Sequence, residues 1–180
     1  MQRKLSPKPT FKPRLECLEG RDLPSAAGIG VFMLSQNIQQ GVQAMQSQAS
    51  QAQSDFGKYG SDLQHGNSSG ALSDVAKLSG EIQAVRALNT QIQSELQLFQ
   101  QSVVAVASDG DSSDQTLAVF SFLQVNGMGG FLGGSNGSSL SSQAQNALSQ
   151  VNNIATANKV PEPNGQTFTL SETIDSVLTS

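Results

Sequence analysis

Residues 78–106 read LSGEIQAVRALNTQIQSELQLFQQSVVAV, and this stretch decides the fold of the chain. Its apolar residues recur in alternating steps of four and three, the repeat of a helix that packs along another helix. The pattern predicts one long helix over about residues 71–107. Its expected pairing residues occupy the a and d positions of successive heptads and are Leu78, Ile82, Val85, Asn89, Ile92, Leu96 and Phe99.

Asn89 is the one polar residue in this seam, and it stands at a central a position. A buried amide there can fix the register or the number of paired helices, at some cost in stability. Alternatively, the side chain faces solvent or a loop and has no part in pairing. The sequence leaves both interpretations open.

A second apolar stripe runs from Val31 to Phe56, on a helix otherwise faced with Gln and Ser and weakened in the middle by Gly41. The strings FGKYG (56–60) and HGNSSG (65–70) interrupt the pattern and predict a loop. Two stripes joined by a loop indicate an antiparallel hairpin. The narrow seams also leave room for self-association.

The remainder of the chain predicts shorter elements. Residues 108–114 form an acidic loop, LAVFSFLQV (117–125) is a short helix or a strand, and 127–137 is a flexible glycine-rich segment. Another helix lies over 140–154 and ends before Pro161, and the capping-box spacing of Thr169 and Glu172 predicts a last short helix. We therefore expect an all-α fold: a disordered N-terminal segment (1–28), a long helical hairpin (29–107), and Gly/Ser-rich loops with one or two further helices (108–180).

Composition limits the possible functions. Hydrophobic residues make up 37%, aromatic residues 5% and charged residues 13% of the chain. Residues 1–22 hold six Lys/Arg against three acids, whereas the rest holds four against eleven. This mildly acidic body has no basic stripe for phosphates, so we expect no nucleic-acid binding. The apolar run at 26–34 has nine residues and a membrane helix needs about twenty, so we expect no transmembrane span.

Chemistry-bearing residues are scarce. One cysteine, Cys17, and one histidine, His65, exclude an intrachain disulfide, a zinc site and a Ser-His-Asp triad. The run from Asp109 to Asp114 has calcium-loop spacing at first, but its sixth position is Asp114 and its twelfth is Phe120, so we interpret it as an acidic turn. Glu81 and Glu95 are expected to be isolated surface acids. We predict no cofactor, no metal site and no enzymatic activity.

Residues 14–25, RLECLEGRDLPS, follow a basic, proline-rich start. This string resembles an N-terminal segment of many planctomycete proteins, written R-L-x-L-E-x-L-E-D-R-x-x-P-S. The resemblance covers about a dozen residues, and Gly20 stands where the family usually has Asp. It implies export or sorting to the cell envelope or the extracellular space. The matching residues are Arg14, Leu15, Glu16, Leu18, Glu19, Arg21, Pro24 and Ser25.

These observations together predict an exported or envelope-associated helical protein that acts by protein–protein contact or self-assembly, without catalysis. The alternative is a secreted effector or substrate-like hairpin of a specialised secretion system. FGKYG between the two stripes loosely resembles the Trp-x-Gly turn of such hairpins, with Tyr59-Gly60 in place of the missing tryptophan motif.

Overall fold

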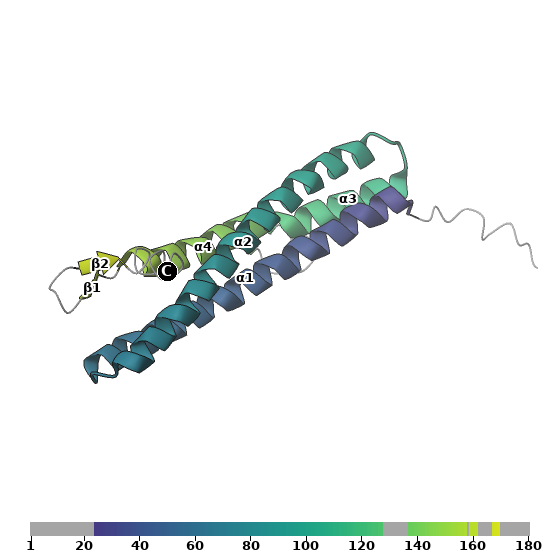
Figure 1. Ribbon diagram of the computed structural model, residues 1–180. Coiled ribbons are helices and arrows are strands. Elements are labelled where there is room, and N and C mark those ends of the chain that lie inside the picture. Colours follow the sequence, from purple (N-terminus) through teal and green to yellow (C-terminus); the bar gives the residue numbers. More distant parts are fainter. Residues whose placement is uncertain (1–23, 128–136, 158, 162–166, 170–180) are drawn as a thin grey trace, which may run out of the picture.

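The computed structural model describes residues 24–127, 137–157, 159–161 and 167–169. In this part of the chain it has four helices, namely α1 (Ala26–Gln64), α2 (Ser68–Ala107), α3 (Ser112–Val125) and α4 (Leu140–Ala157) (Figure 1). The predicted all-α class is confirmed. A small antiparallel ribbon of β1 (Lys159–Pro161) and β2 (Thr167–Thr169), which the sequence did not predict, follows α4.

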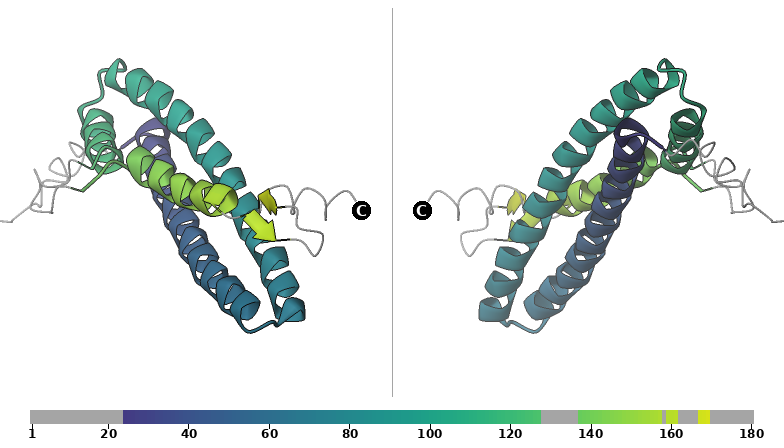
Figure 2. Two further views of the ribbon diagram at one scale, coloured as in Figure 1. Left: turned by 90° about the vertical axis from the view of Figure 1, so that its left-hand side faces the viewer. Right: turned by 90° about the vertical axis from the view of Figure 1, so that its right-hand side faces the viewer.

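The long hairpin is confirmed as α1 and α2. In both views of Figure 2 the two helices meet at their connecting turn and diverge toward their other ends. Each begins at a side-chain cap, since Ser25 accepts from the Ala27 amide at 3.1 Å and Asn67 accepts from the Gly70 amide at 3.2 Å. Helix α1 begins at Ala26, so residues 26–28, which we assigned to the N-terminal segment, belong to the hairpin.

The predicted loop over 56–70 is wrong for most of its length. Helix α1 continues through FGKYG to Gln64, and only residues 65–67 turn the chain, with Gly66 at φ +70°. Gly57 and Gly60 each cost a helix about 1 kcal/mol, but Tyr59 between them is buried in the hairpin interface. Tertiary burial therefore overrides the helix-breaking composition. FGKYG therefore does not correspond to a Trp-x-Gly turn, because residues 56–60 are helical.

Helices α3 and α4 pack against the hairpin, α3 beside the start of α1 and α4 along its middle (Figures 1 and 2). LAVFSFLQV is helical, and α3 begins at Ser112, inside the stretch expected to be a loop, because Asp111 caps it. The Gly137 amide donates to the Gly127 carbonyl at 3.2 Å, which brings the two ends of the glycine-rich segment together. Residues 128–136 and the last predicted helix lie outside the described residues.

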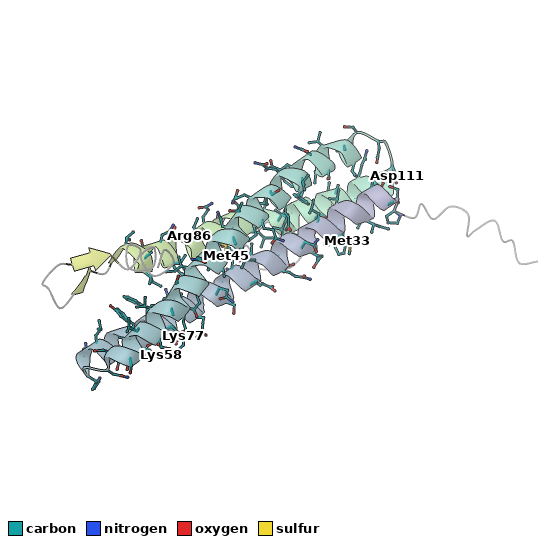
Figure 3. The ribbon with its side chains drawn as sticks, viewed as in Figure 1. Met33, Met45, Lys58, Lys77, Arg86 and Asp111 are labelled. Carbon is teal, nitrogen blue, oxygen red and sulfur yellow. The ribbon has the colours of Figure 1, made fainter. Side chains whose placement is uncertain are left out.

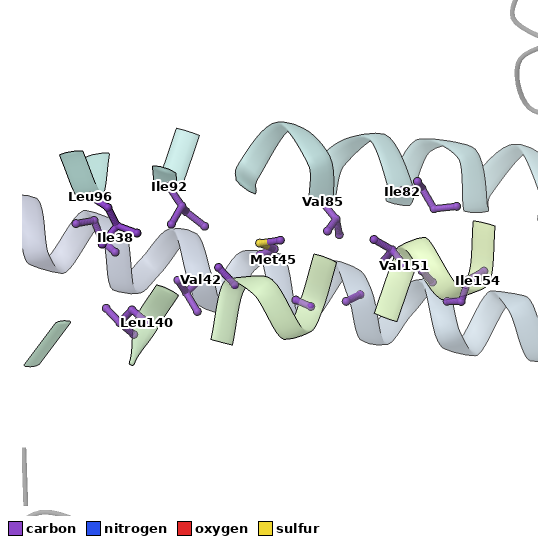
Figure 4. Close-up of a cluster of buried hydrophobic side chains, with 14 of the residues drawn as sticks. Ile38, Val42, Met45, Ile82, Val85, Ile92, Leu96, Leu140, Val151 and Ile154 are labelled. Atoms are coloured by element: carbon purple, nitrogen blue, oxygen red, sulfur yellow. The ribbon is translucent and has the colours of Figure 1, made fainter. Parts of the chain in front are cut away.

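The core consists of the two predicted stripes and the inner face of α4 (Figure 4). Ile38, Val42 and Met45 of α1 meet Val85 and Ile92 of α2, all essentially inaccessible to solvent. Helices α1 and α4 also bury several alanines in this core, and such small side chains allow helix axes to approach closely. The buried alanines of these two helices are Ala49, Ala52, Ala144, Ala147 and Ala155.

Candidate functional site

Exposed apolar side chains gather where the start of α1, the end of α2 and α3 meet, and we call this region the apolar end. The exposed fraction of Val104 is 67%, whereas Val85 in the core of the same helix is fully buried. Met33, labelled in Figure 3 on the outer side of α1, is 57% exposed. The large exposed apolar residues of the apolar end are Ile29, Phe32, Met33, Val104, Val119, Phe120 and Phe122.

Two apolar grooves flank the last turns of α2 in the apolar end. One, of about 440 Å³, lies between α1 and α2 and is lined among others by Gly30, Met33 and Val106. The other, of about 430 Å³, lies between α2 and α3 and is lined among others by Val103, Val119 and Phe122. Neither lining includes a charged side chain. The arrangement offers contact surface for apolar groups rather than reactive groups for chemistry.

A buried carboxylate holds the apolar end together. Asp114, in the first turn of α3, is fully buried and accepts the Ser25 amide at Oδ1 (2.7 Å) and the Ser25 hydroxyl at Oδ2. It lies at the N-terminal ends of both α1 and α3, where helix dipoles favour a negative charge. Gly28 makes room, because a Cβ there would lie 2.3 Å from Asp114 Oδ1. This contact sets α3 beside α1.

Of the predicted targeting residues, Pro24 and Ser25 lie in the described part of the chain, and Arg14, Leu15, Glu16, Leu18, Glu19 and Arg21 lie outside it. Ser25 is the N-cap of α1 and a partner of Asp114. The last residue of the family-like string therefore belongs to the start of α1. Its sorting role stays a prediction.

The predicted pairing residues line the inner face of α2. Leu78, Ile82, Val85, Ile92, Leu96 and Phe99 are all buried. Asn89 is half-buried, and its Oδ1 is enclosed without a hydrogen-bond partner. One turn further on, the Gln93 Nε2 is enclosed and unpartnered as well. Asn89 thus lies at the edge of the helix interface and does not face solvent. Its side-chain oxygen lacks a hydrogen-bond partner.

The opposite end of the hairpin carries most of the charge, and we call it the charged tip. Its buried acids each pair with an exposed lysine one turn later in the same helix, Asp55 with Lys58 at 2.5 Å and Asp74 with Lys77 at 3.1 Å. Figure 3 labels both lysines near the turn. The sequence analysis did not predict that these two acids are buried. Their spacing could have indicated it, because Asp55 follows Ala52 by three residues and Asp74 precedes Leu78 by four, so both lie on the buried faces of their helices.

Glu81 is not the isolated surface acid that we expected. It is half-buried in the charged tip, and burial first, then the negative charge of Asp55, raise the pKa of Glu81 to about 7. The Lys58 ammonium, conversely, lowers the pKa of Asp55. Glu95, two heptads along the same helix, accepts a hydrogen bond from the side-chain Nε2 of Gln91 at 2.8 Å. The sequence places both acids on one helix, but only the fold distinguishes them.

The described residues bring together no three His, Cys, Asp or Glu side chains that could hold a metal ion. In the acidic turn, Asp111 accepts from the Ser113 and Asp114 amides and Asp109 accepts from the Asp111 amide, so these oxygens cap the start of α3. His65 is exposed at the end of α1, with its Nδ1 2.7 Å from the Ser61 carbonyl oxygen.

Comparisons with family models, with curated proteins and with solved structures find no match to this chain. Across the helices that the structure describes, none combines the length and the apolar character needed to cross a membrane.

Proposed function

We propose that this protein is an exported or envelope-associated helical protein that acts by protein–protein contact, through self-association, and not by catalysis. The observation that carries the proposal is the apolar end. There, seven large apolar side chains stand exposed, and three of them, Met33, Val119 and Phe122, line two uncharged grooves. Exposed large apolar side chains beside apolar grooves are typical of interaction sites.

A second copy of the chain is the partner that the charge distribution favours. Helix α1 has no charged residue from position 26 to 54, α4 has none along its length, and α3 has only the buried Asp114. The acids of the apolar end that reach its surface, Asp109 and Asp111, are confined to the turn between α2 and α3. Two helical surfaces that meet away from this turn avoid like-charge repulsion, whereas a strongly charged partner would gain nothing from them. Gln side chains already join helices across this bundle, as in the pair of Gln124 and Gln39 at 2.7 Å.

The export part of the proposal rests on the resemblance of residues 14–25 to the planctomycete segment. Ser25, the last residue of this string, caps α1, and Arg14 to Leu23 lie outside the described residues.

Self-association is tested by light scattering coupled to gel filtration over a range of concentrations. We expect wild type to form a discrete oligomer, and the double variant Val104→Gln, Val119→Gln to weaken its association on the order of tenfold or more, since central apolar contacts carry most of the binding energy. The control is Leu72→Gln, because Leu72 is exposed to the same 67% as Val104 but lies at the charged tip. A wild type that stays monomeric at high concentration would sink this part of the proposal.

Export is tested separately with a reporter fused to residues 1–25. We expect the fusion in the envelope or the medium, and a version with Leu15, Leu18 and Arg21 replaced by serine in the cytoplasm. If the two fusions distribute alike, the segment is not a sorting signal, whatever the outcome of the association experiment.

A further inference from the structure

The first two turns of α1 present only apolar residues and glycine to solvent. Figures 1 and 2 show this part of α1 at one end of the bundle, beside α3. The exposed residues between positions 26 and 33 are Ala26, Ala27, Ile29, Gly30, Phe32 and Met33. The first exposed polar side chain of α1 is Asn37, so the helix begins with a stretch whose solvent side offers no hydrogen-bonding side chain.

The three large side chains of this stretch form one face, which we call the outer face of α1. Ile29 is 49% exposed, Phe32 36% and Met33 57%. Residues three and four apart lie on the same side of a helix. The buried Val31 and Ser35 lie on the opposite side, because each residue turns the helix by about 100°. Ile29 and Met33 therefore point away from the helices that cover Val31 and Ser35, as the label of Met33 in Figure 3 shows.

A basic segment precedes the outer face in the chain, and we call residues 1–15 the basic run. It contains no acid, and its cations are Arg3, Lys4, Lys8, Lys12 and Arg14. The acids that follow it are Glu16, Glu19 and Asp22. Clusters of about four to eight Lys and Arg next to an apolar helix surface are typical of segments that bind anionic lipid headgroups.

The acids at this end of the described chain do not lie on α1, which has no acid before Asp55. Asp114 is buried against Ser25. Asp109 and Asp111 lie in the turn between α2 and α3, where each accepts a backbone amide. An anionic headgroup beside the outer face therefore meets no carboxylate of α1 itself.

A lipid surface fits the outer face and the basic run together, whereas a second copy of the chain does not. A second copy would bring its own basic run to the contact, and like charges repel. Anionic headgroups attract these cations, and the region below the headgroups takes up the apolar side chains of a helix that lies on the membrane. Self-association is tested on other helices of the apolar end, through Val104 of α2 and Val119 of α3.

We propose that the outer face of α1 and the basic run form a peripheral attachment site for a membrane with anionic headgroups. Ile29, Phe32 and Met33 enter the boundary between headgroups and acyl chains, and the cations of the basic run bind the headgroup phosphates. The inference rests on the envelope association in the proposed function, since it names the contact that holds the protein there.

Insertion of the outer face is tested by fluorescence on the full chain, which has no tryptophan. We expect the emission of Ile29→Trp to shift to shorter wavelength with phosphatidylcholine vesicles that contain about 30% phosphatidylglycerol, and brominated lipids to quench it. The control Leu72→Trp, at a 67% exposed position of the charged tip, should respond to neither. A shift of Ile29→Trp that appears without vesicles and grows with protein concentration would mean that a second copy covers the face, and would overturn the proposal.

The apolar contribution is measured by co-flotation with the same vesicles. The double variant Ile29→Gln, Met33→Gln should weaken binding by about tenfold or more, because two apolar side chains no longer enter the membrane. Both are about half exposed, so their loss should leave the fold intact, which circular dichroism checks. The matched control Leu63→Gln, Leu72→Gln removes side chains that are 42% and 67% exposed at the charged tip and should bind as wild type.

The electrostatic contribution is measured with neutral vesicles of phosphatidylcholine alone. Wild type should prefer the anionic vesicles by about tenfold or more and lose this preference between about 0.05 and 0.5 M salt. The triple variant Lys4→Gln, Lys8→Gln, Lys12→Gln should lose most of it at low salt as well. Equal wild-type affinity for both vesicles, or unchanged binding of the Ile29→Gln, Met33→Gln variant, would overturn the proposal.

These outcomes are separate from those of the proposed function. A chain that binds vesicles while its reporter stays in the cytoplasm contradicts export alone. An exported chain that ignores anionic vesicles contradicts the attachment site alone.

Discussion

Gly28 shows at the scale of one residue how closely α1 and α3 approach. Its missing side chain leaves the space that the buried Asp114 carboxylate occupies while it binds Ser25. We expect Gly28→Ala to lower the free energy of unfolding by about 2 kcal/mol, because the added methyl group displaces a buried, hydrogen-bonded carboxylate. Thermal or urea unfolding measures the change.

Gly30 is the matched control, since a Cβ there meets nothing within 4 Å. Gly30→Ala should leave stability unchanged or raise it by up to about 1 kcal/mol, the gain of alanine over glycine in a helix. Equal effects at both positions would contradict the close contact between Gly28 and Asp114.

Asn89 is the second informative residue. Because its Oδ1 is enclosed without a partner, we expect Asn89→Leu to raise the free energy of unfolding by about 1 kcal/mol and to relax the register of the helices. Ser94→Leu, on the exposed side of the same helix, is the control. Unchanged stability together with an unchanged oligomeric state in gel filtration would mean that Asn89 has no role in pairing.

At the scale of the element, the informative feature is the extension of α1 beyond Phe56. Gly57 is helical and its Cβ position is open, so Gly57→Ala should stabilise the protein by about 1 kcal/mol. Gly66→Ala, at the turn, should destabilise it by about the same amount, because φ is +70° there. Denaturant titration of both variants measures whether the free energy of unfolding rises or falls. A neutral result at Gly57 would place FGKYG in a loop instead.

The spacing of apolar residues predicted α1 and α2 correctly over the segments where the regularly spaced apolar residues are also the buried ones. The stripes from Val31 to Met45 and from Leu78 to Phe99 are the core, as expected. The prediction was wrong at 56–64 and at 112–114, where glycines and polar residues indicated loops. In both places a contact distant in sequence, the burial of Tyr59 in the hairpin and the bond of Asp114 to Ser25, stabilises helix instead.

At the scale of the whole molecule, the charged tip lies at one end of the hairpin, and the apolar end lies at the other, where the solvent-accessible acids are confined to the turn of Asp109 and Asp111 and the two grooves have no charged lining. Association through an uncharged surface should not weaken with salt. We expect the oligomer to persist, or to strengthen, when the salt concentration rises from about 0.05 to 0.5 M, because screening removes nothing favourable and salt strengthens apolar burial. Sedimentation velocity at both concentrations measures this. A marked loss of association in salt would point to charged contacts.

Composition and local periodicity are enough to predict the buried faces of the two long helices, the scarcity of charge and the single histidine and cysteine, because none of these depends on contacts distant in sequence. The tertiary structure alone decided the roles of three carboxyl groups. Asp114 reads as part of an acidic turn but lies buried between two helix starts, Asp55 continues an apolar stripe, and Glu81 differs from Glu95 only in what faces it across the hairpin. A carboxyl group takes its pKa and its partners from the surrounding helices, and those neighbours come together only when the chain has folded.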